Sequence, residues 1–146
     1  MQASPHIAIA ILNYNGRHHL EHYLPSVMQT NYPNYSVWVI DNDSTDDSLL
    51  FLQEYYPQIK RIVNPYNGGF AAGYNMGLGQ RDAPYILLLN TDGAVSPNFL
   101  QPLAQTMERH PTMAMVQPKI LSDTQRSHFE YAGAGGGAMD GLGYPF

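Results

Sequence analysis

Three consecutive polar residues, Asn90, Thr91 and Asp92, are the first candidates for chemistry in this sequence. They directly follow the run Tyr85–Leu89, whose continuous apolar character is typical of a buried β-strand. One residue separates Asn90 from Asp92, so the oxygens of both side chains can reach the same hard cation. Such cations typically take one or two protein carboxylates and complete their shell with phosphate oxygens and water. The motif therefore predicts a divalent-cation site, for Mg²⁺ or Mn²⁺, at Asn90 and Asp92.

Polar residues also end three other runs that are typical of buried strands. In an open parallel sheet, ligands bind beyond the carboxyl ends of the strands, so polar side chains gathered there indicate a polar ligand. The carboxylate of Asp41 can accept hydrogen bonds from the edge of a base or from a ribose diol. One such residue alone is usually a turn or a helix cap, and the prediction therefore depends on their number. The residues that end these three runs are Asn13, Asp41, Asn42 and Asn64.

A glycine-rich segment, residues 64–77 with the sequence NPYNGGFAAGYNMG, follows the third of these runs. It is neither a dinucleotide fingerprint nor a P-loop, because it lacks the glycine spacing of the first and the Gly-Lys-Ser/Thr of the second. Gly68 and Gly69 allow left-handed backbone angles and a close approach of a ligand. The helix predicted after them offers N–H groups to an anion. A glycine turn against a neighbouring strand is the alternative interpretation.

Short apolar runs alternate with stretches of helical periodicity. This order predicts an α/β fold with a mostly parallel sheet and helices on both faces. The predicted strands are residues 6–14, 35–42, 59–64, 84–90 and 113–121, with Pro118 interrupting the last. The signals for the helices, in chain order, are Leu20 and Leu24 after Gly16, the capping box of Ser44 and Asp47, the glycine-rich residues 70–80, and the N-cap pair Ser96 and Pro97.

The composition limits the classes of partner. The chain has 146 residues, which fits one domain over residues 1–146, and its net charge of -5 argues against binding to nucleic acid. With only 7 Lys and Arg, an anionic ligand must be held by a few local groups, by backbone N–H donors or by a metal ion. The sequence contains no Cys, no apolar run of membrane-spanning length and no basic start of a signal peptide. We therefore expect a cytoplasmic protein.

Four motifs in this order resemble the family 2 glycosyltransferases, whose domain has the GT-A fold. They are AILNYNG, VIDNDSTDDS, NGGFAAGYNMG and LLLNTDGAVSPNFL, and the match that they belong to covers nearly the whole chain. The chain is most similar to the rhamnosyltransferase-like subgroup of bacterial enzymes that build surface polysaccharides. The resemblance implies a nucleoside-diphosphate sugar donor, linked to UDP or dTDP, and a glycan or lipid-linked acceptor. It also implies peripheral association of the full-length protein with the inner face of the membrane.

The resemblance also implies roles for individual residues. Asp92 is the last residue of the family's D-x-D motif and would bind the divalent ion. Asn90 replaces the first Asp of that motif, and the loss of one formal charge should weaken metal binding. Thr91, between them, belongs to the implied nucleotide-sugar site. The residues that would hold the nucleoside are Asn13, Asn15, Asp41 and Asn42, and those that would shape the pocket around ribose and diphosphate are Asn67, Gly69 and Asn75.

The mechanism implied by the resemblance is inverting transfer, in which a general base removes the proton of the acceptor hydroxyl. The family's base is an Asp or Glu well downstream of the D-x-D motif, and we expect it beyond Phe146. Asp123, Glu130 and Asp140 are interpreted as ordinary loop residues. The glycine-rich residues 131–146 are expected to be the mobile end of a truncated chain. The prediction is a nucleotide-sugar-binding part that lacks most of the acceptor site.

Two other classes of protein remain as alternatives. A non-catalytic nucleotide-binding or receiver-like regulatory module would cluster acids after its first strand and carry a Lys near the end of its fifth. Lys119 fits the second condition, but the first run ends in LNYN. A nucleotidyltransferase would carry Arg and Lys in a glycine-rich loop after the first strand, and NYNGRHHL has the wrong composition. His18 and His22 are one helical turn apart, but they are not spaced as a metal site with any acid.

Overall fold

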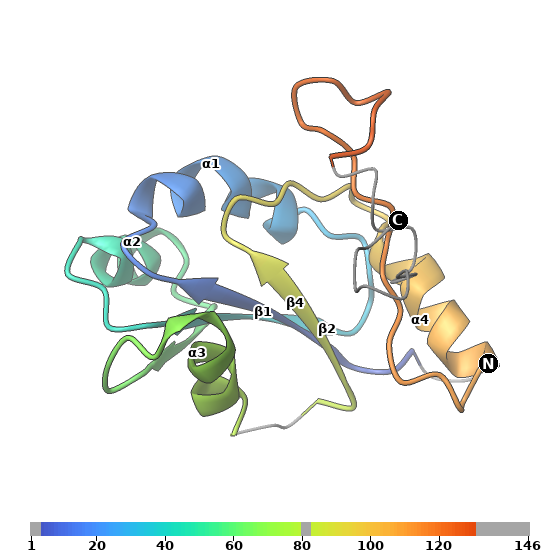
Figure 1. Cartoon of the computed structure of the whole chain (residues 1–146), viewed down its shortest axis with the longest axis horizontal. Helices are drawn as coiled ribbons and strands as arrows, with labels where there is room; N and C mark the ends of the chain where they lie inside the picture. Colours follow the sequence, from blue (N-terminus) through green and yellow to red (C-terminus); the bar gives the residue numbers. More distant parts are fainter. Residues whose placement is uncertain (1–3, 80–82, 131–146) are drawn as a thin grey trace, which may run out of the picture. The chain divides into compact units, whose positions relative to one another are not determined.

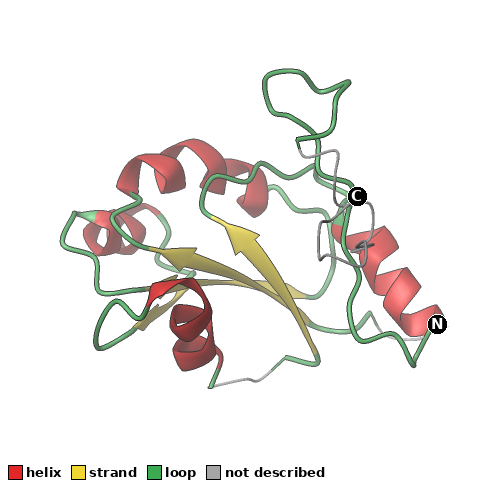
Figure 2. Cartoon of the chain, in the orientation of Figure 1, coloured by secondary structure: helices red, strands yellow, loops and turns green. Residues whose placement is uncertain are grey.

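The computed structural model describes residues 4–79 and 83–130. Contacts between residues divide the chain into two compact units, Met1–Asn98 and Phe99–Phe146. Among the described residues, the first unit contains four strands and three helices, and the second contains one helix followed by loops and turns (Figures 1 and 2). The prediction that residues 131–146 are the mobile end of a truncated chain concerns residues outside the described part of the chain.

The first unit is an entirely parallel sheet with the strand order β3-β2-β1-β4. The four strands predicted from their apolar runs are confirmed. Their bounds are β1 (Ile7–Asn13), β2 (Tyr35–Asp41), β3 (Lys60–Val63) and β4 (Tyr85–Asn90). The register pairs Asn13 with Asp41, Asp41 with Val63, and Leu12 with Asn90. The carboxyl ends of all four strands therefore lie along one edge of the sheet, as expected for parallel strands.

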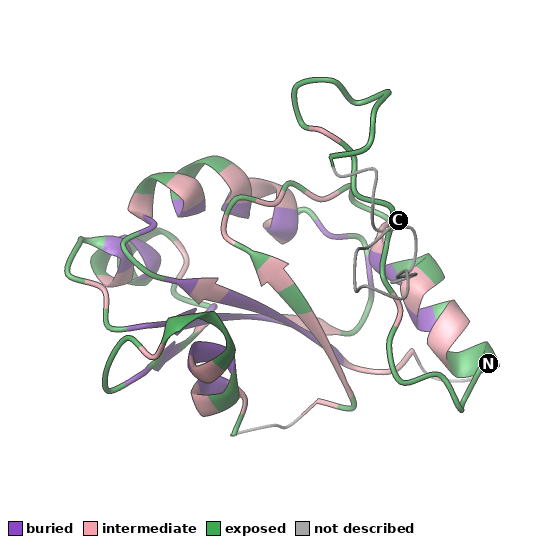
Figure 3. Cartoon of the chain, viewed as in Figure 1, coloured by how far each residue is buried: buried purple, intermediate pink, exposed green. Residues whose placement is uncertain are grey.

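Helices cover both faces of this sheet, as predicted. They are α1 (Arg17–Met28), α2 (Ser48–Tyr55) and α3 (Gly69–Leu78), and Figure 1 shows α1 and α2 on the opposite side of the sheet from α3. Because side chains alternate along a strand, successive residues of β1 face opposite layers. Ala8 and Ala10 pack with Trp38, Ile40, Ile62 and Tyr74 in the layer of α3, while Ile9 and Ile11 point to the other side. Both sides of β1 and β2 are buried (Figure 3).

Helix α2 begins three residues later than the capping box predicts. The helix starts at Ser48, with Asp47 at the N-cap position and no hydrogen bond from a capping side chain. The predicted capping role of Ser44 is wrong because its hydroxyl has other partners. It accepts hydrogen bonds from Asn13 Nδ2 at 3.1 Å and from the backbone N–H of Asn15 at 3.0 Å. Ser44 therefore joins the ends of β1 and β2 instead of starting a helix.

Two predictions near and within the second unit are also wrong. Helix α4 (Leu100–Arg109) has Phe99 at its N-cap, so Ser96 and Pro97 precede the helix instead of opening it. The predicted fifth strand, residues 113–121, does not form, and this segment takes part only in one isolated antiparallel bridge, between Leu121 and Phe129. Pro118 offers no N–H to a ladder, which disfavours a continuous strand there. Among the described residues, none of the helices is both long and apolar enough to cross a bilayer.

Candidate functional site

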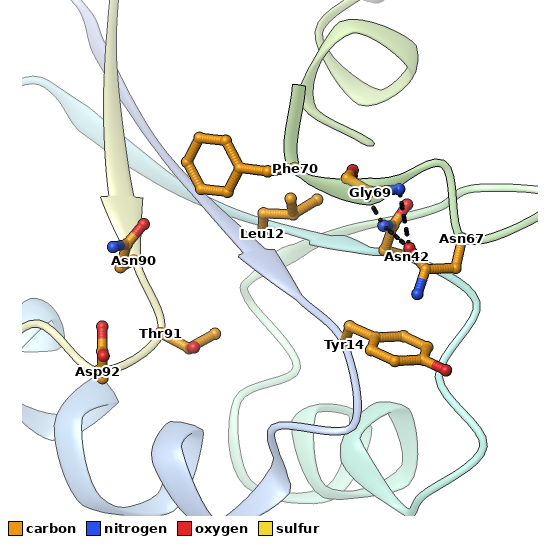
Figure 4. A pocket seen from close by; sticks show the side chains of 9 residues that line it. All are labelled: Leu12, Tyr14, Asn42, Asn67, Gly69, Phe70, Asn90, Thr91 and Asp92. Carbon is orange, nitrogen blue, oxygen red and sulfur yellow. Dashed lines mark hydrogen bonds between the residues drawn. The ribbon is translucent and has the colours of Figure 1, made fainter. Parts of the chain in front are cut away.

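A cavity of about 420 Å³ lies at the carboxyl edge of the sheet in the first unit. This volume falls within the range of pockets that hold small molecules. Side chains from the ends of β1, β2 and β4 and from the start of α3 surround it (Figure 4). The lining residues are Leu12, Tyr14, Asn42, Asn67, Gly69, Phe70, Asn90, Thr91 and Asp92. We call Asn42, Asn67 and Gly69 the amide wall, and Asn90, Thr91 and Asp92 the β4 wall.

The amide wall is held together by hydrogen bonds within the protein. Asn42 Nδ2 donates to Asn67 Oδ1 at 2.6 Å and to the carbonyl oxygen of Gly69 at 3.3 Å. The backbone N–H of Gly69 donates to the same Asn67 oxygen at 2.9 Å. Gly69 has a φ of 77°, which a residue with a side chain rarely adopts. The glycine is therefore required for the turn that brings α3 against Asn42 and Asn67.

Asn64 supports the amide wall from behind. It is buried, and its Nδ2 donates at 3.0 Å both to Asn42 Oδ1 and to the carbonyl oxygen of Gly73. A Cβ atom at Gly73 would lie 2.9 Å from Asn42 Oδ1 and 2.9 Å from Leu12 Cδ1. The close approach of α3 to the strand ends thus depends on a glycine at this position. The ends of β2 and β3 and the helix form one connected amide network.

The β4 wall has a different character. Asn90 ends β4 and Asp92 lies in the turn that follows, which is closed by a hydrogen bond from the N–H of Gly93 to the carbonyl oxygen of Asn90 at 3.3 Å. Both side chains are exposed, and among residues 4–79 and 83–130 neither has a hydrogen bond or an ion pair. Figure 4 shows both on the same side of the cavity, across from the amide wall. Their oxygens are therefore available to a ligand.

The charge of the cavity determines what it can bind. Asp92 is the only charged residue among the nine that line it, and the other polar side chains are neutral. A diphosphate would meet a carboxylate without a Lys or Arg to offset it, which is unfavourable unless a cation is shared. In the described part of the chain, no group of three or more His, Cys, Asp and Glu could hold a metal by itself. One carboxylate and one amide oxygen fit a Mg²⁺ or Mn²⁺ ion whose shell includes ligand phosphates.

Four residues predicted for the site do not line the cavity. Asn13 and Asp41 are buried below it, where Asn13 Nδ2 donates to Asp41 Oδ1 at 2.9 Å and the backbone N–H of Ser44 donates to Asp41 Oδ2 at 2.9 Å. Asn15 Oδ1 accepts hydrogen bonds from the backbone N–H of Thr45 at 2.8 Å and of Asp46 at 3.2 Å. Asn75 lies on an exposed part of α3. Asn13, Asn15 and Asp41 thus join the loops after β1 and β2.

Asp46 completes this junction of loops. Its Oδ2 accepts a hydrogen bond from the backbone N–H of Arg17 at 3.0 Å, and its Oδ1 accepts one from the N–H of Ser48 at 3.0 Å. Partial burial alone would raise the pKa of Asp46, but the hydrogen bonds from Ser48 and Arg17 outweigh it, with a smaller contribution from the Arg17 charge. The pKa of Asp46 is therefore lowered. Its charged form stabilises the start of both α1 and α2.

Three lining residues were not predicted from the sequence as site residues: Leu12, Tyr14 and Phe70. Tyr14 and Phe70 have exposed fractions of 51% and 62%, which are high for large aromatic side chains. The sequence contained a signal for both. Tyr14 stands between two asparagines at a strand end, and Phe70 directly follows the glycine pair. Aromatic residues in such loops are available to stack on a planar or apolar part of a ligand.

The receiver-like alternative does not fit the sheet. Receiver domains have the flavodoxin-like strand order 2-1-3-4-5, whereas the order here is β3-β2-β1-β4, as in the first half of a Rossmann sheet. Lys119 lies in a loop outside the named strands, and its ammonium group lies 5.4 Å from the ring centroid of Phe129. The observation that favoured a receiver therefore has no counterpart in the fold.

The parallel sheet, with its cavity at the carboxyl edge, defines a Rossmann-like α/β domain. Residues 8–132 match the model of the family described as "Glycosyl transferase family 2". The chain therefore belongs to family 2 of the glycosyltransferases, as the sequence motifs predicted. The rhamnosyltransferase-like subgroup is a finer assignment that this match does not make.

Curated relatives agree with this family. A glycosyltransferase of Haemophilus influenzae is 27% identical over 113 residues, which are 75% of this chain and 35% of that protein. The Escherichia coli enzyme WfgD, named UDP-Glc:alpha-D-GlcNAc-diphosphoundecaprenol beta-1,3-glucosyltransferase, is 28% identical over 96 residues, or 65% of this chain and 38% of that protein. This chain therefore spans well under half the length of these relatives.

Solved structures agree with the fold. A fragment of S. aureus TarS in complex with UDP-GlcNAc has a TM-score of 0.64 and 20% identity, covering 80% of this chain and 38% of that one. A mannosyltransferase from Pyrobaculum calidifontis, in complex with GDP-Man and Mn²⁺, has a TM-score of 0.65 and 17% identity, covering 81% of this chain and 34% of that one. These neighbours are GT-A glycosyltransferases, so the predicted GT-A fold is confirmed.

Proposed function

We propose that this chain is the donor-binding part of a glycosyltransferase that uses a nucleoside-diphosphate sugar. The observation that carries the proposal is the cavity between the amide wall and the β4 wall, at the carboxyl edge of a parallel sheet. Ligands of open α/β sheets bind at this edge. The two solved neighbours described above hold nucleotide sugars, UDP-GlcNAc in one and GDP-Man in the other, which supports the same ligand class here.

The two walls suit different parts of such a donor. The amide of the exposed Asn67, which the buried Asn42 holds in place, can exchange hydrogen bonds with a ribose or a base, and the exposed ring of Tyr14 can stack on the base. Asp41 and Asn13 would contribute by fixing the strand ends below this part of the cavity. Asn15 and Asn75, which lie outside the lining, would act at the margin of a bound donor. These roles in binding are part of the proposal.

The β4 wall suits the diphosphate. Asp92, with Asn90 as a neutral second ligand and Thr91 between them, would hold a Mg²⁺ or Mn²⁺ ion. When bound, this ion would supply positive charge to stabilise the departing nucleoside diphosphate. The neighbour that contains Mn²⁺ supports a divalent ion in this fold. The chain itself provides one formal negative charge at the site, so the ion and the nucleotide should bind together rather than separately.

The reaction we propose is inverting transfer. An acceptor hydroxyl attacks the anomeric carbon on the face opposite the diphosphate, the bond from that carbon to the diphosphate oxygen breaks, and a general base takes the hydroxyl proton. The described residues do not suggest this base, and we propose that it and most of the acceptor site belong to sequence beyond Phe146. The acceptor would be a glycan or a lipid-linked glycan, as the name of the Escherichia coli relative indicates for that enzyme.

The finer assignments belong to the same proposal. A rhamnosyltransferase-like subgroup with a UDP- or dTDP-linked donor fits the order of the sequence motifs. Work at the cytoplasmic face of a membrane fits an acceptor attached to a lipid. Residues 1–146 would then form the nucleotide-sugar-binding part of the domain.

Isothermal titration of the chain with UDP, dTDP and GDP, each with and without Mn²⁺, tests the proposal. We expect one nucleotide to bind, and Mn²⁺ to strengthen its binding. Asp92→Ala should weaken the Mn²⁺-dependent binding by at least roughly tenfold, or about 1.4 kcal/mol, because the one carboxylate of the cavity is lost. Glu54→Gln, which removes one negative charge from an exposed position on α2, is the matched control and should bind like the parent chain.

Two results would contradict the proposal. Absence of binding for every nucleotide would exclude the donor-binding function for this chain. Unchanged affinity in Asp92→Ala would remove Asp92 from the metal site.

A further inference from the structure

The hydroxyl of Tyr74 lies at the carboxyl end of the paired strands β1 and β4. The backbone N–H of Leu12 donates to this hydroxyl at 3.3 Å, and the hydroxyl donates to the carbonyl oxygen of Leu89 at 3.0 Å. The carbonyl oxygen of Ala10 lies at 3.4 Å as a second acceptor. The register pairs Leu12 with Asn90, so the N–H of Leu12 and the carbonyl of Leu89 are natural partners in a parallel ladder. One phenol thus connects both strands at the point where they reach the cavity.

The surroundings of Tyr74 fix this arrangement. Its side chain is 3% exposed, and it packs in the core cluster with Ala8 and Ala10, whose small side chains leave room for a ring against β1. Burial raises the pKa of Tyr74, and the hydrogen bond from Leu12 opposes this only in part. The phenol therefore stays protonated at neutral pH and keeps its proton to donate. Its ring also supports Phe70, with the two centroids 5.1 Å apart in an edge-to-face contact.

Tyr74 links the two sides of the cavity. It belongs to α3, whose first residues Gly69 and Phe70 line the cavity, and its hydroxyl holds the strand that ends in Asn90. The hydrogen bonds described for the amide wall connect α3 to β2 and β3 only. Through Tyr74 the same helix is also tied to β4. Displacement of β4 relative to α3 would change the distance between the amide wall and the β4 wall.

We infer that Tyr74 is a positioning residue whose hydroxyl fixes the β4 wall relative to α3, so that both walls can contact one ligand. The structural part of this inference is independent of the ligand's identity, and its effect on nucleotide binding rests on the proposed function. A phenylalanine at this position would keep the ring, the core packing and the contact with Phe70. It would remove only the hydroxyl through which α3 is bonded to both paired strands.

The first test needs no nucleotide. Amide hydrogen exchange, followed by NMR, compares the parent chain with Tyr74→Phe. We expect exchange of the Leu12 amide and of the amides of residues 89–92 to rise roughly fivefold, while amides at the start of β1 keep their rates. The control is Tyr32→Phe, which removes a hydroxyl that donates to the carbonyl of Pro5 at 3.0 Å from an equally buried ring. Unchanged exchange in Tyr74→Phe, or an equal rise at residues 89–92 in Tyr32→Phe, would overturn the inference.

The second test separates positioning from stability. The ratio of nucleotide dissociation constants without and with Mn²⁺ measures how well the two walls act together. We expect this ratio to fall roughly three- to tenfold in Tyr74→Phe and to stay unchanged in Tyr32→Phe. An unchanged ratio in Tyr74→Phe would show a purely structural residue and overturn the inference. If the parent chain binds no nucleotide, the proposed function fails, and the exchange experiment alone decides whether Tyr74 fixes the β4 wall.

Discussion

The two walls of the cavity differ in how their polar groups are used. On the amide wall, Asn42 and Asn67 bond with each other, with Gly69 and with Asn64 behind them. On the β4 wall, Asn90 and Asp92 are exposed, and in the described part of the chain their side chains have no polar partner. The first wall has its geometry set by the fold before any ligand arrives. On the β4 wall the sheet sets the backbone, but the side-chain oxygens of Asn90 and Asp92 have no partner among the described residues.

This difference suits a ligand with two chemically different ends. A network of neutral amides recognises a fixed arrangement of donors and acceptors and is insensitive to salt and pH. A lone carboxylate with an amide beside it recognises charge, and it needs a cation before it can accept an anion. Rigidity on one side and available charge on the other therefore predict that substitutions on the amide wall change stability, and that substitutions on the β4 wall change binding.

The largest effect is expected from Asn64→Ala. The change leaves Asn42 Oδ1 and the carbonyl oxygen of Gly73 without their donor in a buried place. We expect the free energy of unfolding to fall by about 2–4 kcal/mol, measured by urea denaturation. Asn34→Ala is the control, because Asn34 is exposed and donates to the carbonyl of Ser4 at 2.9 Å. Equal losses in both variants would show that the amide network adds no particular stability.

Asn90→Asp tests the β4 wall, and its expected effect is smaller. It adds a second carboxylate to the β4 wall without changing the size of the side chain. We expect Mn²⁺ to bind roughly fivefold more tightly, about 1 kcal/mol, in calorimetric titration of the chain with nucleotide present, with the free energy of unfolding nearly unchanged. Asn98→Asp adds the same charge outside the cavity lining and should leave Mn²⁺ affinity as it is. Equal gains in both variants would point to a general effect of net charge.

The sequence predicted the parts of the site that depend on strand direction. Apolar runs located all four strands of the first unit, and parallel strands necessarily bring their polar ends to one edge. Six predicted residues line the cavity for this reason: Asn42, Asn67, Gly69, Asn90, Thr91 and Asp92. Which of the polar side chains would bond with each other was not predictable. Asp41 and Asn13 look as available in the sequence as Asp92 does, yet each is buried against the other.

The errors have the same physical origin. Ser44 has the spacing of a capping residue, but a tertiary partner 31 positions away, Asn13, takes its hydroxyl. Tyr74 has the sequence pattern of an ordinary core aromatic residue, and its hydrogen bond with the backbone N–H of Leu12 joins residues 62 positions apart. The run 113–121 has apolar strand character, but a strand also needs a neighbour to pair with. Local patterns predict elements, whereas these contacts depend on which elements meet.

The smallest effect is expected from a fall in pH. It should change the stability that the loops after β1 and β2 contribute, but not the amide wall. Neither the amide wall nor Asn64 behind it contains a group that titrates, so neither should respond to pH.

Asp46 does titrate, and its pKa is lowered from the usual 3.8 in the folded chain. Because the unfolded chain binds the proton more tightly, the stabilisation from Asp46 is complete above this value and is lost as the pH falls through the lowered pKa. The free energy of unfolding is measured by urea denaturation of the parent chain and of Asp46→Asn, from about pH 6 to about pH 3. We expect the parent chain to be slightly more stable at about pH 6, and the difference between the two to shrink toward about pH 3. A difference that stays constant, or that grows in acid, would mean that the hydrogen bonds from Arg17 and Ser48 do not depend on the charge of Asp46.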